Sequence, residues 1–296
     1  MNGQLPLISI VITNFNYGQF LSEAIESALG QTYPRTEVIL IDDASTDDSR
    51  DVYQRFSGLV DFVEHADNEG IVFSRNEALR IVKGDYLCFL DADDYWDVDF
   101  LQQMYNVASE SGADVVYPDW RLFGDINEIR SFPEFDPILL QLQKIHCTAE
   151  SLLRLSSVRQ YTFEPLDVAE DWDFFIKLSL EGLMFKHADN CLINYRIKHE
   201  SRTTAGDEIE VIRQFVTILE KFKTTYGDRV IEPLELVLSK IDDKNRLIAA
   251  IAERNQQLQD DILAIQRSRS FKLGSALTKP LRILRDIRKH KFIAEI

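Results

Sequence analysis

The sequence predicts an α/β protein built on a mixed, mainly parallel β-sheet and extended by a C-terminal α-helical coiled coil. Short apolar runs alternate with amphipathic segments over residues 7–90, which is the pattern of β–α–β units around a parallel sheet. Several of these apolar runs end in clusters of polar residues. Residues 234–265 have a different pattern, in which apolar residues repeat every seven positions. These observations divide the chain into residues 1–227, 228–266 and 267–296.

The apolar runs are short, continuous and rich in β-branched residues, as in strands that are buried on both faces. Predicted strands are residues 7–13 (LISIVIT), 37–41 (EVILI), 60–64, 85–90, 114–117 and 192–196. Apolar residues at three-to-four spacing predict helices over residues 18–29, 46–56, 69–82, 172–180 and 208–226. Residues 121–148 contain Pro133 and Pro137 and are expected to be rich in loops.

The repeat in residues 234–265 predicts a coiled coil of more than four heptads. Eight of its ten a and d positions are apolar, and Asn255 falls at an a position. Such a seam needs another helix to cover it, so we expect a homodimer, with folding back onto the same chain as the alternative. The ten positions are Leu234, Val237, Ile241, Lys244, Ile248, Ile251, Asn255, Leu258, Ile262 and Ile265.

Charge is unevenly distributed along the chain. The formal net charge is −16, which argues against binding to nucleic acid. Residues 267–296, in contrast, hold nine Lys and Arg against two Asp and Glu, a net of +7. Because apolar residues interleave with the basic ones, residues 267–292 are expected to lie on an anionic membrane surface. Binding to the chain's own acidic surface is the alternative.

The cysteines and the start of the chain indicate a cytoplasmic protein. The three cysteines are far apart and match neither metal-ligand spacing nor a disulfide framework. The first residues lack a signal peptide's basic region, and no segment approaches the roughly 18 apolar residues of a membrane span. We therefore expect a soluble body in the cytoplasm, held peripherally on the inner face of the plasma membrane by the basic tail.

Three carboxylates, Asp91, Asp93 and Asp94, directly follow the apolar run 85–90. Such a cluster resists burial unless a cation balances it, and oxygen ligands of this kind suit Mn²⁺ or Mg²⁺. Capping of a helix that begins near Asp97 is the alternative, although one Asp would suffice for that.

Two further polar features have two interpretations each. Asp42 and Asp43 follow the run 37–41, where they either cap the next helix or accept the ring N–H of a pyrimidine base. Arg75 lies on the predicted helix 69–82, either on the surface or within reach of a diphosphate. The sequence contains neither a P-loop nor a Rossmann dinucleotide motif.

In combination, four stretches resemble the family 2 glycosyltransferases over roughly residues 6–225. They are ISIVITNFNYGQFLSEAIESALGQTY, EVILIDDASTDDS, NEGIVFSRNEALRIVKGDYLCFLDADD and AEDWDFFIKLSLEG. The resemblance implies the glycosyltransferase A-type fold and inverting transfer, of the hexosyltransferase type, from a nucleotide diphosphate sugar with UDP or dTDP as the nucleotide. It also implies a glycan or lipid-linked glycan acceptor in the assembly of a bacterial cell-surface polysaccharide. Because the processive members' Q-x-x-R-W motif is absent, we expect one sugar per encounter.

The resemblance also implies roles for individual residues. Asp171 matches the general base, and Asp91 and Asp93 match the metal motif, with Asp93 as the more direct ligand. His199 is a further candidate metal ligand, although it stands one residue later than in the family's Tyr-Arg-x-His pattern. Phe15 replaces the family's usual Tyr, so ring stacking is kept and a hydroxyl contact is lost. The residues implied in donor binding are Thr13, Phe15, Asp42, Asp43, Arg75, Asp91 and Ala92.

Two other functions fit parts of the sequence. A catalytically inert scaffold would assemble through the coiled coil and bind a nucleotide sugar, but Asp43, Asp93 and Asp171 are all retained. A sugar nucleotidyltransferase would need a Gly-rich, basic phosphate loop after the first strand, and residues 13–20 (TNFNYGQF) lack one. The sequence does not specify the donor sugar, the acceptor or the linkage.

Overall fold

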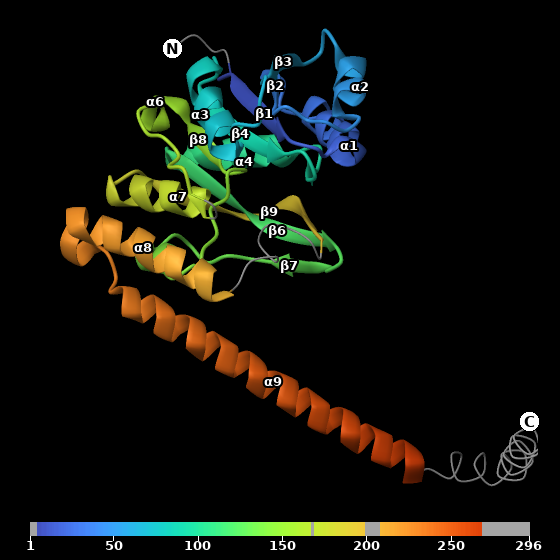
Figure 1. Cartoon of the computed structure of the whole chain (residues 1–296), viewed down its shortest axis with the longest axis vertical. Helices are drawn as coiled ribbons and strands as arrows, with labels where there is room; N and C mark the ends of the chain where they lie inside the picture. Colours follow the sequence, from blue (N-terminus) through green and yellow to red (C-terminus); the bar gives the residue numbers. More distant parts are fainter. Residues whose placement is uncertain (1–4, 167–168, 199–207, 268–296) are drawn as a thin grey trace, which may run out of the picture. The chain divides into compact units, whose positions relative to one another are not determined.

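The computed structural model describes residues 5–166, 169–198 and 208–267. Its internal contacts divide the chain into two compact units, Met1–Val237 and Leu238–Ile296. Within the described residues, the first unit carries a nine-stranded sheet with helices on both faces (Figure 1). The second unit contains the greater part of one long helix.

The sheet is mixed, and its N-terminal half is parallel, as the sequence predicted. The strand order is β3–β2–β1–β4–β8–β6–β9–β5, with β7 paired to β6. Parallel pairs join β1 to β2 and β4, β2 to β3, and β6 to β9, whereas β5, β7 and β8 pair in antiparallel fashion. The strands are β1 Ile8–Asn14, β2 Thr36–Asp42, β3 Asp61–Glu64, β4 Tyr86–Asp91, β5 Tyr95–Trp96, β6 Val115–Gly124, β7 Glu128–Arg130, β8 Leu152–Arg154 and β9 Phe185–Ile197.

Helices cover both faces of the sheet because successive side chains of a buried strand point to opposite sides. Along β1, Ile10 and Ile12 belong to the core under α1 and α4, and Val11 belongs to the core under α3 and α7. The helices are α1 Gly18–Leu29, α2 Ser49–Tyr53, α3 Ile71–Ile81, α4 Phe100–Ser111, α5 Pro137–Gln141, α6 Leu155–Val158, α7 Glu170–Leu180, α8 Glu208–Tyr226 and α9 Pro233–Arg267, with short 3₁₀ turns at Gln54–Phe56 and Gly227–Arg229.

The predicted boundaries were wrong in the middle of the chain. β6 and β9 are longer than the predicted strands 114–117 and 192–196, and they pair over ten positions. Pro118 marks a shift in the register of that pair, so a residue that usually ends a strand is accommodated at an irregularity. Residues 121–148 also hold β7 and α5 within the region expected to be loop.

Several helices begin later than predicted. The segment 46–56 divides into α2 and a 3₁₀ turn, and α4 begins at Phe100 instead of near Asp97. Asp97 instead pairs with Arg121, with a distance of 3.0 Å between Oδ2 and Nη1. The acids after β4 therefore do not cap α4.

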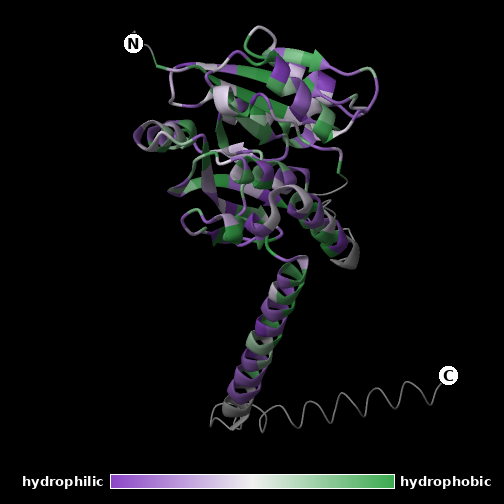
Figure 2. Ribbon diagram, turned by 90° about the vertical axis from the view of Figure 1, so that its left-hand side faces the viewer, coloured by the Kyte–Doolittle hydropathy of each residue, from purple (hydrophilic) through white to green (hydrophobic). Residues whose placement is uncertain are grey.

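The predicted coiled-coil segment lies in one continuous helix, α9, of 35 residues. Several of its apolar side chains are exposed to solvent, namely Leu234, Leu238, Ile241, Leu247, Ile248 and Leu258. Figure 2 shows hydrophobic and hydrophilic residues intermixed along this helix. None of the helices in the described ranges is long and apolar enough to cross a membrane. The predicted membrane-binding segment 267–292 lies outside the described residues from Ser268 onward.

Candidate functional site

The carboxyl ends of β1, β2 and β4 meet at one edge of the sheet. In the parallel register, Thr13 of β1 lies beside Asp91 of β4, and Asn14 of β1 lies beside Asp42 of β2. The Thr13 hydroxyl donates to Asp91 Oδ1 over 3.0 Å. Ligands of open α/β sheets bind at this edge, so the polar residues that follow these strands form the candidate site.

Arg75 of α3 is the buried cation of the site. Its Nη1 donates to Glu170 Oε1 over 3.0 Å, and its Nη2 lies 3.3 Å from Asp91 Oδ1. Burial alone would lower the pKa of Arg75, but Asp91, Glu170 and Asp171 outweigh it and raise that pKa. The surface position that the sequence left open for Arg75 is therefore wrong. Its guanidinium ties α3 to α7 across the end of β4.

Asp171 lies in the first turn of α7, which begins after Ala169. Ala169 adopts a left-handed backbone conformation with φ of 64°, which is uncommon for a residue with a side chain and turns the chain into the helix. The Asp171 carboxylate accepts from the Trp172 backbone N–H over 2.7 Å. Burial and the neighbouring Glu170 nevertheless raise the pKa of Asp171 from 3.8 to about 6. A carboxyl with this pKa can exchange a proton near neutral pH.

A group of acids follows β4 and faces Glu150, which precedes the antiparallel strand β8. Burial raises the pKa of Asp93, with a further contribution from Asp91, while an ion pair of 3.1 Å to Lys198 Nζ opposes the shift. Burial raises the pKa values of Asp94 and Glu150 well above the ordinary range, and each is raised further by the acids around it. Glu150 Oε1 is buried and accepts no hydrogen bond from the described part of the chain.

This acidic group fits a divalent cation through its chemistry, because buried carboxylates in excess of their basic partners attract a hard ion. Within the described residues, no cluster of three or more His, Cys, Asp or Glu side chains could hold a metal ion alone. Asp91 and Asp93 would thus supply part of a coordination shell, and oxygens of a bound diphosphate the remainder. The predicted third ligand, His199, lies outside the described residues.

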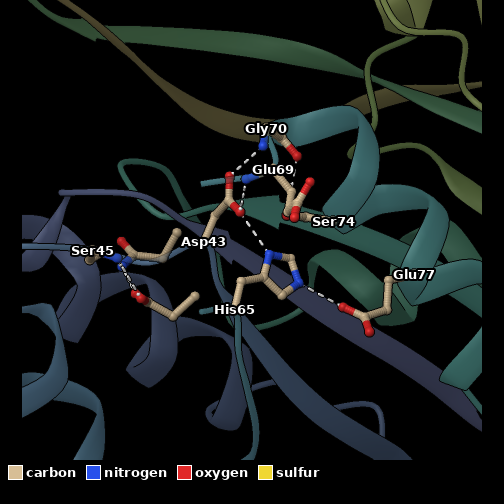
Figure 3. Close-up of polar contacts among 9 residues, drawn as sticks. Asp43, Ser45, His65, Glu69, Gly70, Ser74 and Glu77 are labelled. Atoms are coloured by element: carbon tan, nitrogen blue, oxygen red, sulfur yellow. Dashed lines mark hydrogen bonds and ion pairs between the residues drawn. The ribbon is translucent and has the colours of Figure 1, made fainter. Parts of the chain in front are cut away.

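Asp43 belongs to a separate network of hydrogen bonds between β2 and α3 (Figure 3). Its Oδ2 accepts from Gly70 N over 2.7 Å, and its Oδ1 accepts from Glu69 N over 2.9 Å. His65 Nδ1 lies 2.7 Å from the same Oδ1. The Asp43 side chain is therefore fixed by the loop before α3 and does not cap α2.

The neighbouring Asp42 has a different role from Asp43. Asn14 Nδ2 donates to Asp42 Oδ2 over 2.6 Å, and Ser45 N donates to Asp42 Oδ1 over 2.8 Å. These contacts hold the loop after β2 in place. Asp42 therefore holds the loop after β2, whereas Asp43 holds the loop before α3 and keeps one acceptor position on Oδ2.

The other predicted donor-binding residues differ in exposure. Thr13 is 5% exposed and Ala92 only 1%, and Ala92 N donates to Thr13 O over 3.2 Å. Phe15 is 40% exposed, so its ring is available for stacking. The structure thus places the backbone of Ala92 and the ring of Phe15 at the same edge of the sheet.

Sequence reasoning did not single out four residues of the site: His65, Glu77, Glu150 and Lys198. His65 directly follows β3, so the rule that drew attention to the ends of β1, β2 and β4 would also have found it. Glu150 enters the site through the antiparallel strand β8, which the sequence did not reveal. No local signal marks Lys198, whose position depends on the long strand β9.

Known proteins resemble this chain in sequence. The family described as Glycosyl transferase family 2 matches residues 9–157. The UDP-Glc:alpha-D-GlcNAc-diphosphoundecaprenol beta-1,3-glucosyltransferase WfaP of Escherichia coli is 28% identical over 215 residues, 71% of this chain and 84% of that protein. The putative teichuronic acid biosynthesis glycosyltransferase TuaG of Bacillus subtilis is 25% identical over 209 residues, 68% of this chain and 83% of TuaG.

Solved structures resemble it in fold. S. aureus TarS 1-349 in complex with UDP-GlcNAc superposes with a TM-score of 0.63 at 18% identity, covering 77% of this chain and 69% of the TarS chain. The mannosyltransferase PcManGT from Pyrobaculum calidifontis, in complex with GDP-Man and Mn²⁺, superposes with a TM-score of 0.60 at 17% identity. The superposition covers 94% of this chain and 85% of the PcManGT chain. The predicted glycosyltransferase A-type fold is thereby confirmed. Since the family match spans half of the chain, this protein belongs to glycosyl transferase family 2 and is a glycosyltransferase.

Proposed function

We propose that this protein transfers a single sugar, with inversion, from a UDP- or dTDP-linked donor to an acceptor hydroxyl in the assembly of a bacterial cell-surface polysaccharide. One observation carries the proposal: Asp171, with a pKa of about 6, shares its surroundings with Arg75 and Asp91 at the ligand-binding edge of the sheet. A proton acceptor thus lies beside a cation and a carboxylate suited to a diphosphate and its counter-ion.

The donor would lie along this edge with its base at Asp43. A carboxylate offers about four acceptor positions, and three of those on Asp43 are filled by Glu69, Gly70 and His65. The remaining position, on Oδ2, can accept the ring N–H of a uracil or thymine. The exposed ring of Phe15 can stack on the nucleoside, with Thr13 and Ala92 forming the floor beneath it.

The diphosphate would lie between Arg75 and the acids after β4. Arg75 Nε is buried and makes no hydrogen bond within the described residues, so the guanidinium retains unused donor capacity. Asp93, together with Asp91, would hold Mn²⁺ or Mg²⁺, and PcManGT binds Mn²⁺ with its own donor. When bound, such an ion stabilises the negative charge of the leaving diphosphate.

Asp171 would act as the general base. As the acceptor oxygen attacks the anomeric carbon from the face opposite the diphosphate, the bond to the diphosphate breaks and Asp171 takes the hydroxyl proton. The raised pKa suits this role because the carboxylate is ionised at neutral pH and still holds a proton well enough to receive one.

The names of the relatives support a class of acceptor. The name of WfaP includes a GlcNAc-diphosphoundecaprenol acceptor. The name of TuaG refers to teichuronic acid biosynthesis. We infer a glycan or lipid-linked glycan acceptor for this chain. We also infer a catalytic domain over residues 1–227, a homodimer through residues 234–265 and contact of residues 267–292 with the inner face of the plasma membrane.

The experiment that tests the proposal is a screen of nucleotide sugars with Mn²⁺ and a lipid-linked sugar diphosphate acceptor. Product formation from a UDP- or dTDP-sugar, with inverted anomeric configuration by NMR, supports it. A product with retained configuration removes the inverting mechanism. Binding of a nucleotide sugar with neither transfer nor hydrolysis leaves the inert scaffold as the better description.

A further inference from the structure

His65 lies between the carboxylates of Asp43 and Glu77, as Figure 3 shows. Its Nδ1 is 2.7 Å from Asp43 Oδ1, and its Nε2 is 2.7 Å from Glu77 Oε2 on α3. The His65 side chain is only 7% exposed, and the ring of Phe73 packs against it at 81° with a centroid distance of 5.2 Å. The imidazole is therefore fixed on two sides by acids and on a third by an aromatic ring.

This geometry favours a proton on both ring nitrogens. A neutral imidazole has one N–H, so its second nitrogen would direct a lone pair at a carboxylate oxygen at hydrogen-bond distance. An imidazolium donates to both oxygens instead, and such charge-assisted bonds are the stronger kind. The two acids also raise the pKa of His65 in spite of its burial, which acts in the opposite direction.

The carboxylates of Asp43 and Glu77 differ in how freely they can move away from His65. The Asp43 side chain is 6% exposed and holds two further backbone bonds, whereas the Glu77 side chain is 25% exposed. Glu77 can turn toward water when His65 loses a proton, and Asp43 cannot. Asp43 is held by Glu69 N and Gly70 N, and a protonated His65 adds a charge-assisted bond to its Oδ1, which restricts the orientation of the carboxylate further.

We propose that His65, held by Glu77, is a positioning residue of the donor pocket, which orients Asp43 so that its Oδ2 receives the ring N–H of the nucleotide base. The inference rests on the proposed function, in which Asp43 contacts the base. It assigns to His65 a part in selecting a base with a ring N–H, and it makes donor binding weaker as the pH rises through the His65 pKa.

The test is calorimetric binding of UDP and CDP, with Mn²⁺, to the full chain and its variants at pH 6 and pH 8.5. The two ligands differ at ring position 3, where uracil carries a hydrogen and cytosine does not. His65→Leu removes both hydrogen bonds, while His65→Asn keeps a donor near the Nδ1 position without a titrating group. Asp67→Asn is the matched control, because it removes an exposed acid from the same loop.

His65→Leu is expected to weaken UDP binding at pH 6 by up to roughly tenfold, because Asp43 is then less firmly oriented toward the base, and to reduce the preference for UDP over CDP. His65→Asn should restore most of that preference and remove the pH dependence that the unmodified chain shows. Glu77→Gln should move the weakening of UDP binding to lower pH. Asp67→Asn should bind as the unmodified chain does.

Two results overturn the inference. If Asp43→Asn reduces the UDP preference and both His65 variants keep it, the proposed function stands and His65 has no positioning role. If the unmodified chain shows no preference for UDP over CDP, or Asp43→Asn leaves it unchanged, the assignment of Asp43 to the base fails, and the role of His65 fails with it. Melting temperatures of all variants, measured at both pH values, identify any variant that has not folded.

Discussion

Replacing Asp171 by Asn is expected to stabilise the protein and nearly to abolish transfer. Burial and Glu170 raise the pKa of Asp171 from 3.8 to about 6, while Arg75 acts in the opposite direction. A carboxyl with a raised pKa in the folded state binds its proton more tightly there than in the unfolded chain. Its stabilising contribution is complete below 3.8 and is lost as the pH rises through about 6, so the ionised Asp171 destabilises the fold at neutral pH.

The magnitude follows from the size of the shift. About two pKa units correspond to about 3 kcal/mol. Asp171 is only half-buried by its accessible surface, and solvent screening reduces this to roughly 1–2 kcal/mol. For a unit of this size, each kcal/mol moves the melting temperature by about 2–4 °C, so Asp171→Asn should raise it by several degrees at pH 7.5. At pH 5 the difference should be about half as large, because the native carboxyl is then mostly protonated.

Although Asp171→Asn should raise the melting temperature, it should lower the catalytic activity. Loss of a general base lowers kcat by roughly 10²- to 10⁴-fold, and UDP affinity should change little. Scanning fluorimetry and a UDP-release assay measure the two effects in the same samples. Asp173→Asn is the control, because Asp173 lies on the same helix and pairs with Lys221 outside the site. Near-normal turnover, or loss of UDP binding, in Asp171→Asn would refute the role of Asp171 as the base.

Four other outcomes are expected. In the unmodified enzyme, kcat should fall about tenfold per pH unit below the Asp171 pKa of about 6, and Glu170→Gln should move that limb to lower pH in a pH–rate profile. Asp93→Asn should abolish transfer with the fold intact by circular dichroism, and substantial turnover of this variant in EDTA would exclude the metal role. Ending the chain at about residue 228 should convert a dimer to a monomer in sedimentation, and a full chain that already sediments as a monomer would exclude the dimer. The full chain should co-float with anionic liposomes at low salt but not at high salt, and equal flotation of a chain ending near residue 265 would contradict the role of the tail.

Some residues of the candidate site can be predicted from their neighbours in the sequence, whereas the roles of others depend on distant parts of the chain. Asp91 and Asp93 were found because a buried apolar strand that ends in several carboxylates is unusual by itself. The distinction between Asp42 and Asp43 was not available from their positions, since both follow β2 directly. It depends on Asn14 of β1 for one and on the loop before α3 for the other.

Glu150 and Lys198 are the clearest examples of site residues that the sequence could not predict. Each is brought to the acids after β4 by a strand whose pairing involves distant residues: β8 runs antiparallel to β4, and β9 pairs with β6 around an irregular register. The loop expected over residues 121–148 was predicted from Pro133 and Pro137, and both keep their usual places, Pro133 in an irregular segment and Pro137 at the start of α5. The strand β7 forms before them by pairing with β6, which no local signal predicted.

The sequence by itself determined the α/β class, the parallel half of the sheet and the family, and it predicted the edge of the sheet at which ligands would bind. These follow from side-chain periodicity and from local motifs, both of which are properties of neighbouring residues. Only the tertiary structure decided that Arg75 is buried between Asp91 and Glu170, that the pKa of Asp171 is raised to about 6, and that His65 bridges Asp43 and Glu77. The reason is that burial and the distance between charges depend on how the chain folds back on itself, and these quantities set the electrostatics of the site.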